Sequence, residues 1–350
     1  MGLPAVNRVV VVLVDGLGAA ALKSRAGHAR TLAGALTPAT TIDSGFPTTT
    51  ASALATLTTG VLPGQHGLVG YSVLDAANDR VVNQLSGWDD KLDPHTWQAQ
   101  PTVFEQAVGL GFSAAVIGPG RYKGSGFSEA VLRGAEFIAG SSIADRFELA
   151  ADWVRAPGPA GIAYLYVPEL DQTGHASGWE SPAWTTWLET LDGELRRFVA
   201  GLPSKAGVIV TADHGVVDVP AHTHVLVDEL EGALDGIRHI AGEPRCLQLY
   251  FEPDASEADR ARTVAAWHES EDSRAWVATR AEAIEAGWFG EVLPEIVARI
   301  GDIIVAARKN IAYYDGRIAN NHGRNMVGQH GSWSPAEVQV PLLRFGAFAR

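Results

Sequence analysis

Cysteine is nearly absent from this 350-residue sequence, in which Cys246 is the single thiol. One thiol cannot form an intrachain disulfide or a thiolate metal cluster, so the sequence excludes zinc fingers and disulfide-rich secreted scaffolds. Long hydrophobic runs are lacking too. The run Val9–Val14 is stopped by Asp15, far short of the ~20 apolar residues that span a bilayer. We therefore expect no association with a membrane.

Positive charge is scarce as well. The chain has 27 Lys and Arg against 40 Asp and Glu, which gives a formal net charge of −13. Such a charge repels nucleic acid, so we expect no stable nucleic-acid binding, and a phosphate substrate would need cations placed at its site. Residues 1–8 lack the basic segment and apolar stretch of a signal peptide, which predicts a cytoplasmic location. The sequence leaves the oligomeric state open.

Four short apolar segments share one design, and each is followed by turn-forming residues. Their β-branched, nearly continuous apolar character is typical of strands buried on both faces of a parallel sheet. These segments are Val9–Val14, Ser113–Ile117, Gly161–Val167 and Gly207–Thr211. Apolar residues spaced three and four apart predict helices between them, over Pro101–Leu110, Ala144–Trp153 and Ala183–Val199. This alternation predicts a three-layer α/β/α fold with a mostly parallel central sheet.

Residues 236–299 differ in texture from the rest of the chain. Their pattern predicts a strand, a helix, a second strand and a second helix, over Arg238–Phe251, Glu257–Glu269, Trp276–Thr279 and Arg280–Gly287. We therefore expect a small α+β insertion, at 236–299, that caps a core made of residues 1–235 and 300–350. Beyond the insertion, we expect a strand pair that returns to the core, at Ile303–Ala307 and Asn310–Tyr314.

Carboxylates and imidazoles follow three of the four predicted strands. Ligands gather outside the carboxyl ends of parallel strands, so these side chains are candidates for one metal centre. The candidates are Asp15, Asp171, His175, Asp213 and His214, with His330 in a glycine-rich loop. Oxygen and nitrogen ligands without thiolates suit Zn²⁺ best, with Mn²⁺ or Fe²⁺ as alternatives. His222 and His224 stay open as ligands. We interpret the following as surface or core residues: His28, His66, His95, His239 and His268.

Thr50 is the candidate nucleophile. It ends the segment Phe46–Thr50, just before a helix of small residues that stops at Gly60. The pattern places Thr50 near the N-cap, which is also an ordinary structural use of threonine. A helix N-terminus attracts an anion, and a bound metal ion would make the hydroxyl nucleophilic. A threonine at this position beside a His/Asp metal pair favours in-line phosphoryl transfer.

These motifs, in this order, resemble the type I phosphodiesterase/nucleotide pyrophosphatase family of the alkaline phosphatase superfamily. The motifs are Asp15, Phe46–Thr50, Gly60–Gly67, Asp171–His175, Asp213–Gly215 and His330–Gly331. The resemblance implies an alkaline phosphatase-like fold, two Zn²⁺ ions and a phosphoryl-threonine intermediate on Thr50. It implies one ion held by Asp15, Thr50, Asp213 and His214, and the other held by Asp171, His175 and His330. The implied substrate is a small phosphate ester, nucleotides included, with a phosphodiester or pyrophosphate bond.

The sequence departs from the family pattern around the nucleophile. Many members follow it with Phe-Pro-Asn and precede it with Lys, whereas this chain has Ala51–Ala53 and Thr49. Substrate preference therefore stays open: a phosphomonoesterase or a phosphonate hydrolase of the same superfamily is the alternative, and a metal-binding protein without turnover ranks below both. Four aromatic residues are candidates for stacking on a base or sugar: Tyr71, Trp88, Tyr122 and Tyr166.

Overall fold

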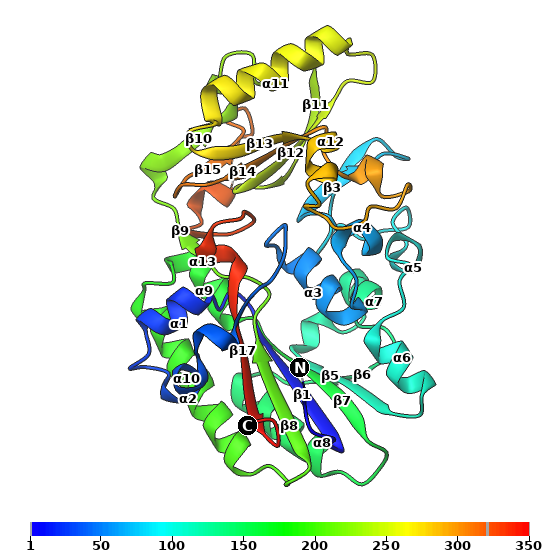
Figure 1. Ribbon diagram of the computed structural model, residues 1–350, viewed down its shortest axis with the longest axis vertical. Helices are drawn as coiled ribbons and strands as arrows, with labels where there is room; N and C mark the ends of the chain where they lie inside the picture. The colour runs from blue at the N-terminus through cyan, green and yellow to red at the C-terminus, as the bar shows by residue number, and fades with distance from the viewer. Residues whose placement is uncertain (1, 320–321, 350) are drawn as a thin grey trace.

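A seven-stranded sheet forms the centre of the larger part of the molecule (Figure 1). The computed structural model describes residues 2–319 and 322–349. Five neighbouring strands, from β8 to β6, are parallel, and β17 runs antiparallel at the β8 side. In spatial order the strands are β2 (Thr41–Asp43), β17 (Gln339–Gly346), β8 (Ala206–Thr211), β1 (Arg8–Val14), β7 (Gly161–Val167), β5 (Ser113–Gly118) and β6 (Glu136–Ala139).

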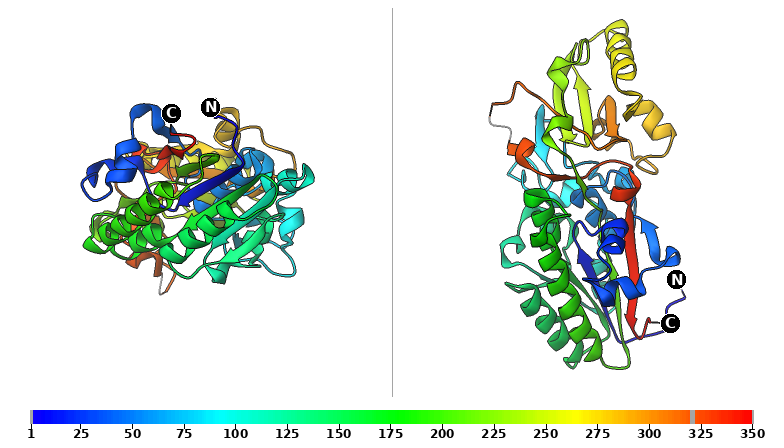
Figure 2. Two further views of the ribbon diagram at one scale, coloured as in Figure 1. Left: turned by 90° about the horizontal axis from the view of Figure 1, so that it is seen from below. Right: turned by 90° about the vertical axis from the view of Figure 1, so that its left-hand side faces the viewer.

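Helices cover both faces of this sheet. Alternate residues of a strand point to opposite faces, so in β1 the side chains of Val10 and Val12 pack on one side and that of Leu13 on the other. The first side is covered by α8 (Ile143–Arg155) and α10 (Pro182–Ala200), which Figure 2 shows in green. The second is covered by α3 (Thr50–Thr59), α6 (Val103–Gly109) and α7 (Gly126–Val131). The predicted three-layer α/β/α fold is confirmed.

The insertion is built on a separate four-stranded antiparallel sheet (Figure 1, top). Its strands are β11 (Ile237–Glu243), β12 (Cys246–Phe251), β14 (Ile303–Ala307) and β13 (Ala275–Thr279), in that order. Helix α11 (Glu257–Glu271) covers one face, where Trp267 is fully buried, and α12 (Arg280–Glu285) follows β13. The insertion lies beyond the carboxyl ends of the parallel strands, which gives the molecule its elongated shape (Figure 2).

Two predicted strand assignments are wrong in this region. Arg238–Phe251 is not one strand but the hairpin of β11 and β12, because Pro244 and Arg245 form a turn between them. Ile303–Ala307 does not return to the core, because as β14 it pairs with β12 and β13 at the middle of the insertion's sheet. That sheet therefore extends beyond residue 299. The expected partner strand, β15 (Ala312–Tyr314), pairs instead with β10 (His224–Leu226).

Shorter elements connect these layers. Two further two-stranded sheets are formed by β3 (Ser72–Asp75) with β4 (Arg80–Asn83) and by β9 (Val217–Asp218) with β16 (Gly328–Gln329). The remaining helices are α1 (Ala19–Ser24), α2 (Arg30–Ala35), α4 (Pro63–His66), α5 (Pro94–Trp97), α9 (Glu169–Ser177) and α13 (Pro335–Val338). None of the helices in the described part of the chain combines the length and the apolar character needed to cross a bilayer.

Candidate active site

All seven sequence-predicted site residues lie close together. The ends of the parallel strands that several of them follow face the insertion (Figure 1). The register aligns the ends of the three innermost strands, since Val14 of β1 pairs with Val167 of β7 and Leu13 pairs with Thr211 of β8. Side chains that follow these strands therefore meet. Asp15 comes directly after β1, Asp171 and His175 lie on α9 after β7, and Asp213 and His214 follow β8, whereas His330 follows β16 and Thr50 begins α3.

Asp15, Asp213 and His214 form one cluster of potential metal ligands, with ligand atoms within 4.8 Å of one another. His214 Nε2 lies 3.5 Å from Asp15 Oδ1 and 3.5 Å from Asp213 Oδ2. The Oγ1 of Thr50 is 3.2 Å from the same nitrogen. The threonine hydroxyl and the two carboxylates thus converge on one buried imidazole.

A second cluster adjoins the first. Ligand atoms of Asp171, His214 and His330 also lie within 4.8 Å of one another. His175 Nε2 is 3.3 Å from Asp171 Oδ2 and 3.3 Å from His330 Nε2. The rings of His214 and His330 stack with centroids 3.7 Å apart. The two sets share His214 but differ in their carboxylates, so the geometry offers two neighbouring cation sites.

The carboxylates fit bound cations in their electrostatics as well. Each of the three aspartates in these clusters has one buried oxygen without a hydrogen-bond partner, namely Asp15 Oδ1, Asp171 Oδ1 and Asp213 Oδ2. A buried, unpaired carboxylate oxygen is costly unless a cation binds it. Burial, followed by the charges of Asp213 and Asp171, raises the pKa of Asp15 well above its ordinary value. Divalent cations would remove this repulsion, so the residues present fit a metal centre.

Backbone carbonyls orient the imidazoles. The Nδ1–H groups of His330 and His175 donate to the carbonyl oxygens of Thr48 and Gly328, at 2.8 and 2.7 Å. These bonds leave Nε2 of each ring free to bind a metal. Burial, with the charges of His214 and His175, lowers the pKa of His330 well below its ordinary value. The ring of His330 is therefore neutral, which is the form that binds metal.

The carboxylates are held equally firmly. The Oδ1 of Asp213 accepts hydrogen bonds from the backbone N–H groups of Gly16 and His214, at 3.1 and 3.0 Å. The Tyr166 hydroxyl donates to Asp15 Oδ2. Gly16 has a φ of +73°, and a Cβ there would lie 3.0 Å from the Cα of Asp171. A glycine after Asp15 is thus required for the close approach of the two ligand segments.

Thr50 is the first residue of α3, and Thr49 is the N-cap. The prediction that placed Thr50 near the N-cap is therefore accurate to one residue. The hydroxyl of Thr50 lies beside the N-terminal turn of a 10-residue helix, where backbone N–H groups and the helix dipole favour an anion. Thr50 is only 7% exposed, so a substrate would reach it through a cavity rather than from open solvent.

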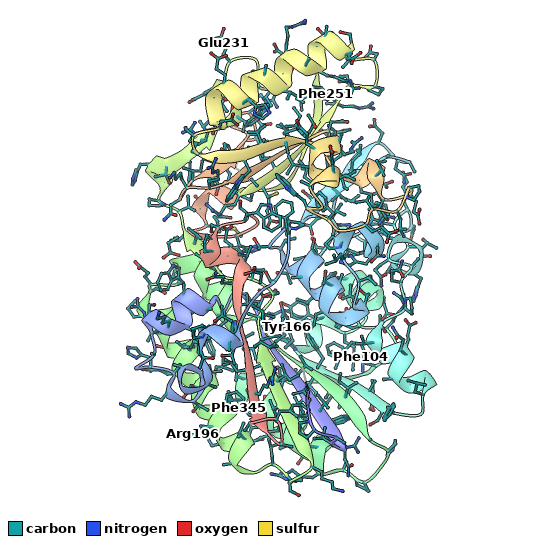
Figure 3. All side chains as sticks on the ribbon, in the orientation of Figure 1. Phe104, Tyr166, Arg196, Glu231, Phe251 and Phe345 are labelled. Carbon is teal, nitrogen blue, oxygen red and sulfur yellow. The ribbon has the colours of Figure 1, made fainter. Side chains whose placement is uncertain are left out.

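Such a cavity adjoins the site, with a volume of about 470 Å³. Thr50, Asp15 and Asp171 are among its lining residues. Tyr122 and Tyr166, whose rings are 5.7 Å apart, line it as well, and Figure 3 shows Tyr166 near the upper end of the central sheet. The rest of the lining is largely apolar, and none of its described residues is Lys, Arg or His. These further lining residues are Leu54, Leu85, Ser86, Val116, Gly118, Ser125, Phe127, Ser128, Leu132, Phe137, Tyr164, Pro168 and Gln172.

Other predicted features fall outside the site. Tyr71 and Trp88 do not line the cavity. His66 is a buried structural residue, hydrogen bonded to Thr56 at 3.0 Å, and burial lowers its pKa to about 3. The ring of His224, left open by the sequence, packs on that of Tyr314. His28, His239 and His268 pair with carboxylates elsewhere.

The sequence reasoning missed one charged residue at the centre. Glu243, at the end of β11, is buried, and its Oε2 lies 3.4 Å from His330 Nδ1. Burial, with the charge of Glu337, raises the pKa of Glu243 well above its ordinary value. A lone glutamate before a proline carries no recognisable motif, so only the tertiary structure reveals it.

Comparison with known proteins agrees with this geometry. Residues 9–333 match the family model described as type I phosphodiesterase/nucleotide pyrophosphatase. The chain is 22% identical over 195 residues to an uncharacterized pyrophosphatase/phosphodiesterase of Schizosaccharomyces pombe, and 25% identical over 185 residues to ectonucleotide pyrophosphatase/phosphodiesterase family member 3 of Mus musculus. These matches cover 53% and 49% of this chain, but only 39% and 20% of those two longer proteins.

Solved structures give the same result for the fold. Murine ectonucleotide pyrophosphatase/phosphodiesterase 5 superposes with a TM-score of 0.73 at 16% identity, covering 97% of this chain and 88% of that one. The human protein of the same name gives 0.73 at 17%, covering 97% and 87%. An inactive threonine-to-alanine variant of the murine protein in complex with AMP gives 0.72 at 15%, covering 97% and 88%. Since the family model matches nearly the whole chain, this protein belongs to the type I phosphodiesterase/nucleotide pyrophosphatase family.

Proposed function

We propose that this protein is a two-metal hydrolase that cleaves a phosphodiester or nucleotide pyrophosphate bond through a phosphoryl-threonine intermediate on Thr50. One observation carries the proposal. The Thr50 hydroxyl lies 3.2 Å from His214 Nε2, at the N-terminus of α3, and Thr50 lines a cavity large enough for a small substrate. The threonine-to-alanine variant of the murine relative is described as inactive, which supports a threonine nucleophile.

The ligand assignment follows the two clusters. Asp15, Thr50, Asp213 and His214 would hold one ion, and Asp171, His175 and His330 would hold the other. The unpartnered oxygens of the three aspartates support this assignment. We propose Zn²⁺ as the metal because the ligands mix imidazole nitrogen with carboxylate oxygen.

The chain's own residues then define the reaction. The Oγ1 of Thr50 attacks phosphorus, so that a P–O bond to threonine forms while the bond to the leaving oxygen breaks, and the leaving group departs with a proton. Water next attacks the phosphoryl-threonine, which releases the product and returns a proton to Thr50. The bound ions supply positive charge that lowers the pKa of the attacking hydroxyl and water and neutralises the phosphoryl oxygens. The backbone N–H groups that begin α3 add donors for those oxygens.

The cavity supports an ester with an apolar or aromatic substituent. Its largely apolar lining suits the uncharged ring or chain of an organic phosphate ester, which inorganic phosphate lacks. Tyr122 and Tyr166 offer aromatic surfaces on which the base of a nucleotide would stack. AMP occupies the solved murine relative, which supports a nucleotide as substrate. A phosphomonoesterase or phosphonate hydrolase is the second candidate, because the metal clusters would serve those reactions equally well.

Hydrolysis assays with Thr50 variants test the proposal. We expect wild-type protein loaded with Zn²⁺ to hydrolyse bis(p-nitrophenyl) phosphate more than about tenfold faster, in kcat/KM, than p-nitrophenyl phosphate, a difference of about 1.4 kcal/mol in transition-state binding. Thr50→Ala should lose turnover of both esters while two metal ions stay bound, and Thr50→Ser, which keeps a hydroxyl, should retain part of it. Full activity in Thr50→Ala would refute the nucleophile, and a reversed preference would favour the monoesterase.

A further inference from the structure

The hairpin of β11 and β12 reaches from the insertion to the metal centre. The last pair in its register joins Glu243 to Cys246, so Pro244 and Arg245 form a two-residue turn at its tip. Glu243 is 8% exposed and Arg245 is fully buried. Charged side chains are almost never buried without partners, so the groups that contact these two side chains show which parts of the protein the turn stabilises.

Glu243 acts on the imidazole of His330. Its carboxylate lies 3.4 Å from Nδ1, on the side of the ring opposite the Nε2 that faces the other ligands. The Nδ1–H itself donates to the carbonyl oxygen of Thr48, so Glu243 supports the ring by packing behind it and limiting its rotation. Gly331 makes this approach possible, because a Cβ at that position would lie 2.6 Å from Cγ of Glu243.

Arg245 pairs with a carboxylate of the core. Its Nε and Nη2 donate to Oε1 and Oε2 of Glu337, each at 2.7 Å, and both side chains are fully buried. Its Nη1 donates to the carbonyl oxygens of Lys309 and Ile311, each at 2.8 Å. This two-point ion pair therefore joins the tip of the insertion to α13 of the core.

Glu337 in turn holds two segments that carry metal ligands. Its Oε1 accepts a hydrogen bond from the backbone N–H of Ser332 at 3.0 Å, two residues after His330. Its backbone carbonyl accepts one from the N–H of Gly215 at 2.8 Å, directly after His214. Displacing Glu337 would therefore move the loops behind both stacked imidazoles.

We propose that the Glu243–Arg245 turn is a positioning element of the metal centre: Glu243 orients His330, and Arg245, through Glu337, fixes the loops that carry His330 and His214. This inference rests on the proposed function, because that function makes the two histidines metal ligands. It gives the insertion a part in the chemistry besides bordering the site.

Metal affinity tests the role of Glu243. Glu243→Ala removes the side chain that packs behind His330 and leaves the hydrogen bond from His330 to Thr48 in place. We expect the Zn²⁺ dissociation constant, measured by competition with a chromophoric chelator, to rise about 10- to 100-fold. Turnover at limiting Zn²⁺ should fall and recover in excess Zn²⁺, and the melting temperature of the metal-free protein should not fall. A lower melting temperature of the metal-free protein with unchanged Zn²⁺ affinity would show a merely structural role and overturn the proposal.

Arg245 needs a variant that leaves no buried charge unpaired. Arg245→Met alone would leave the buried Glu337 carboxylate without its cation and strongly destabilise the protein. We therefore choose the double variant Arg245→Met/Glu337→Met, which replaces the pair by apolar side chains. It should fold, as judged by circular dichroism, and still bind Zn²⁺ about 10-fold or more weakly, because Ser332 loses its acceptor. The matched control is Arg238→Gln. Arg238 lies on the same hairpin and forms an exposed ion pair with Asp79, so this variant should leave the affinity for Zn²⁺ unchanged.

The outcomes separate the two proposals. If wild-type protein binds no Zn²⁺, the proposed function fails and the positioning role fails with it. If the wild type binds Zn²⁺ and hydrolyses the diester, but Glu243→Ala and the double variant bind Zn²⁺ as tightly as the control, only the positioning role is overturned.

Discussion

Asp15→Asn should stabilise the metal-free protein while it destroys metal binding. The Asp15 carboxylate is buried, and Asp213 and Asp171 face it with further negative charge, so its pKa is raised well above the ordinary 3.8. Asparagine keeps the shape, and its amide can donate to Asp213 Oδ2, which has no hydrogen-bond partner. The substitution thus removes a buried negative charge that is stabilised only when a cation is bound.

The sign of the pH dependence follows from linkage. A folded carboxyl with a raised pKa keeps a proton that the unfolded chain has released, so ionising Asp15 costs stability. The cost is absent below the ordinary pKa of 3.8 and is complete above the raised pKa. Each unit of the rise corresponds to about 1.4 kcal/mol. For a chain of this length the unfolding entropy is about 0.7 kcal/mol/K, so each unit should appear as about 2 °C in melting temperature.

Differential scanning calorimetry in excess chelator would measure this effect. We expect Asp15→Asn to melt at least about 2 °C above wild type at pH 8, and the gap to close as the pH falls toward 4. Asp90→Asn, a change at an exposed loop carboxylate, should show no such gap. In excess Zn²⁺ the wild type should melt at the higher temperature, because Asp15→Asn gains less stability from Zn²⁺ binding. A variant that melts at or below wild type in chelator at pH 8 would show that the three carboxylates do not repel one another as described.

Two further predictions concern the second metal cluster and the cavity. His175→Ala removes a nitrogen that lies 3.3 Å from Asp171 Oδ2. The metal content, measured by inductively coupled plasma mass spectrometry, should therefore fall from two ions to about one per chain. A metal content that stays at two would contradict the ligand assignment. Tyr122→Ala opens the aromatic wall beside Tyr166 and should raise KM for an aryl diester more than for a methyl ester, because it removes stacking surface. Exposed Tyr71→Ala is its control, and equal KM changes in both variants would argue against the cavity as the substrate site.

Much of the core architecture could be predicted from the sequence because its signals are local. Continuous apolar runs such as Val9–Val14 and Gly161–Val167 identify buried parallel strands, and the residues that follow them must lie at one edge of the sheet. Asp15, Asp171 and Asp213 were therefore predictable neighbours. The division of ligands between two ions came only from the family resemblance.

The strand pairing of the insertion could not be predicted from local sequence signals. An apolar strand such as Ile303–Ala307 has the same pattern in whichever sheet it joins, and the pairing of β14 with β12 and β13 is decided by contacts between distant segments. The turn at Pro244 and Arg245 was missed because the apolar run that follows it, Cys246–Phe251, was joined to the segment before it as one strand.

The sequence by itself determined which side chains could carry the chemistry: a threonine at a helix start, and carboxylates and imidazoles after buried strands. The tertiary structure decided that His330 stacks on His214 and that Glu243 and Arg245 reach in from the insertion to support them. The physical reason is separation along the chain. Residues 214 and 330 come together only because the strands and loops between them fold back on the core, and no periodicity in the sequence records that closure.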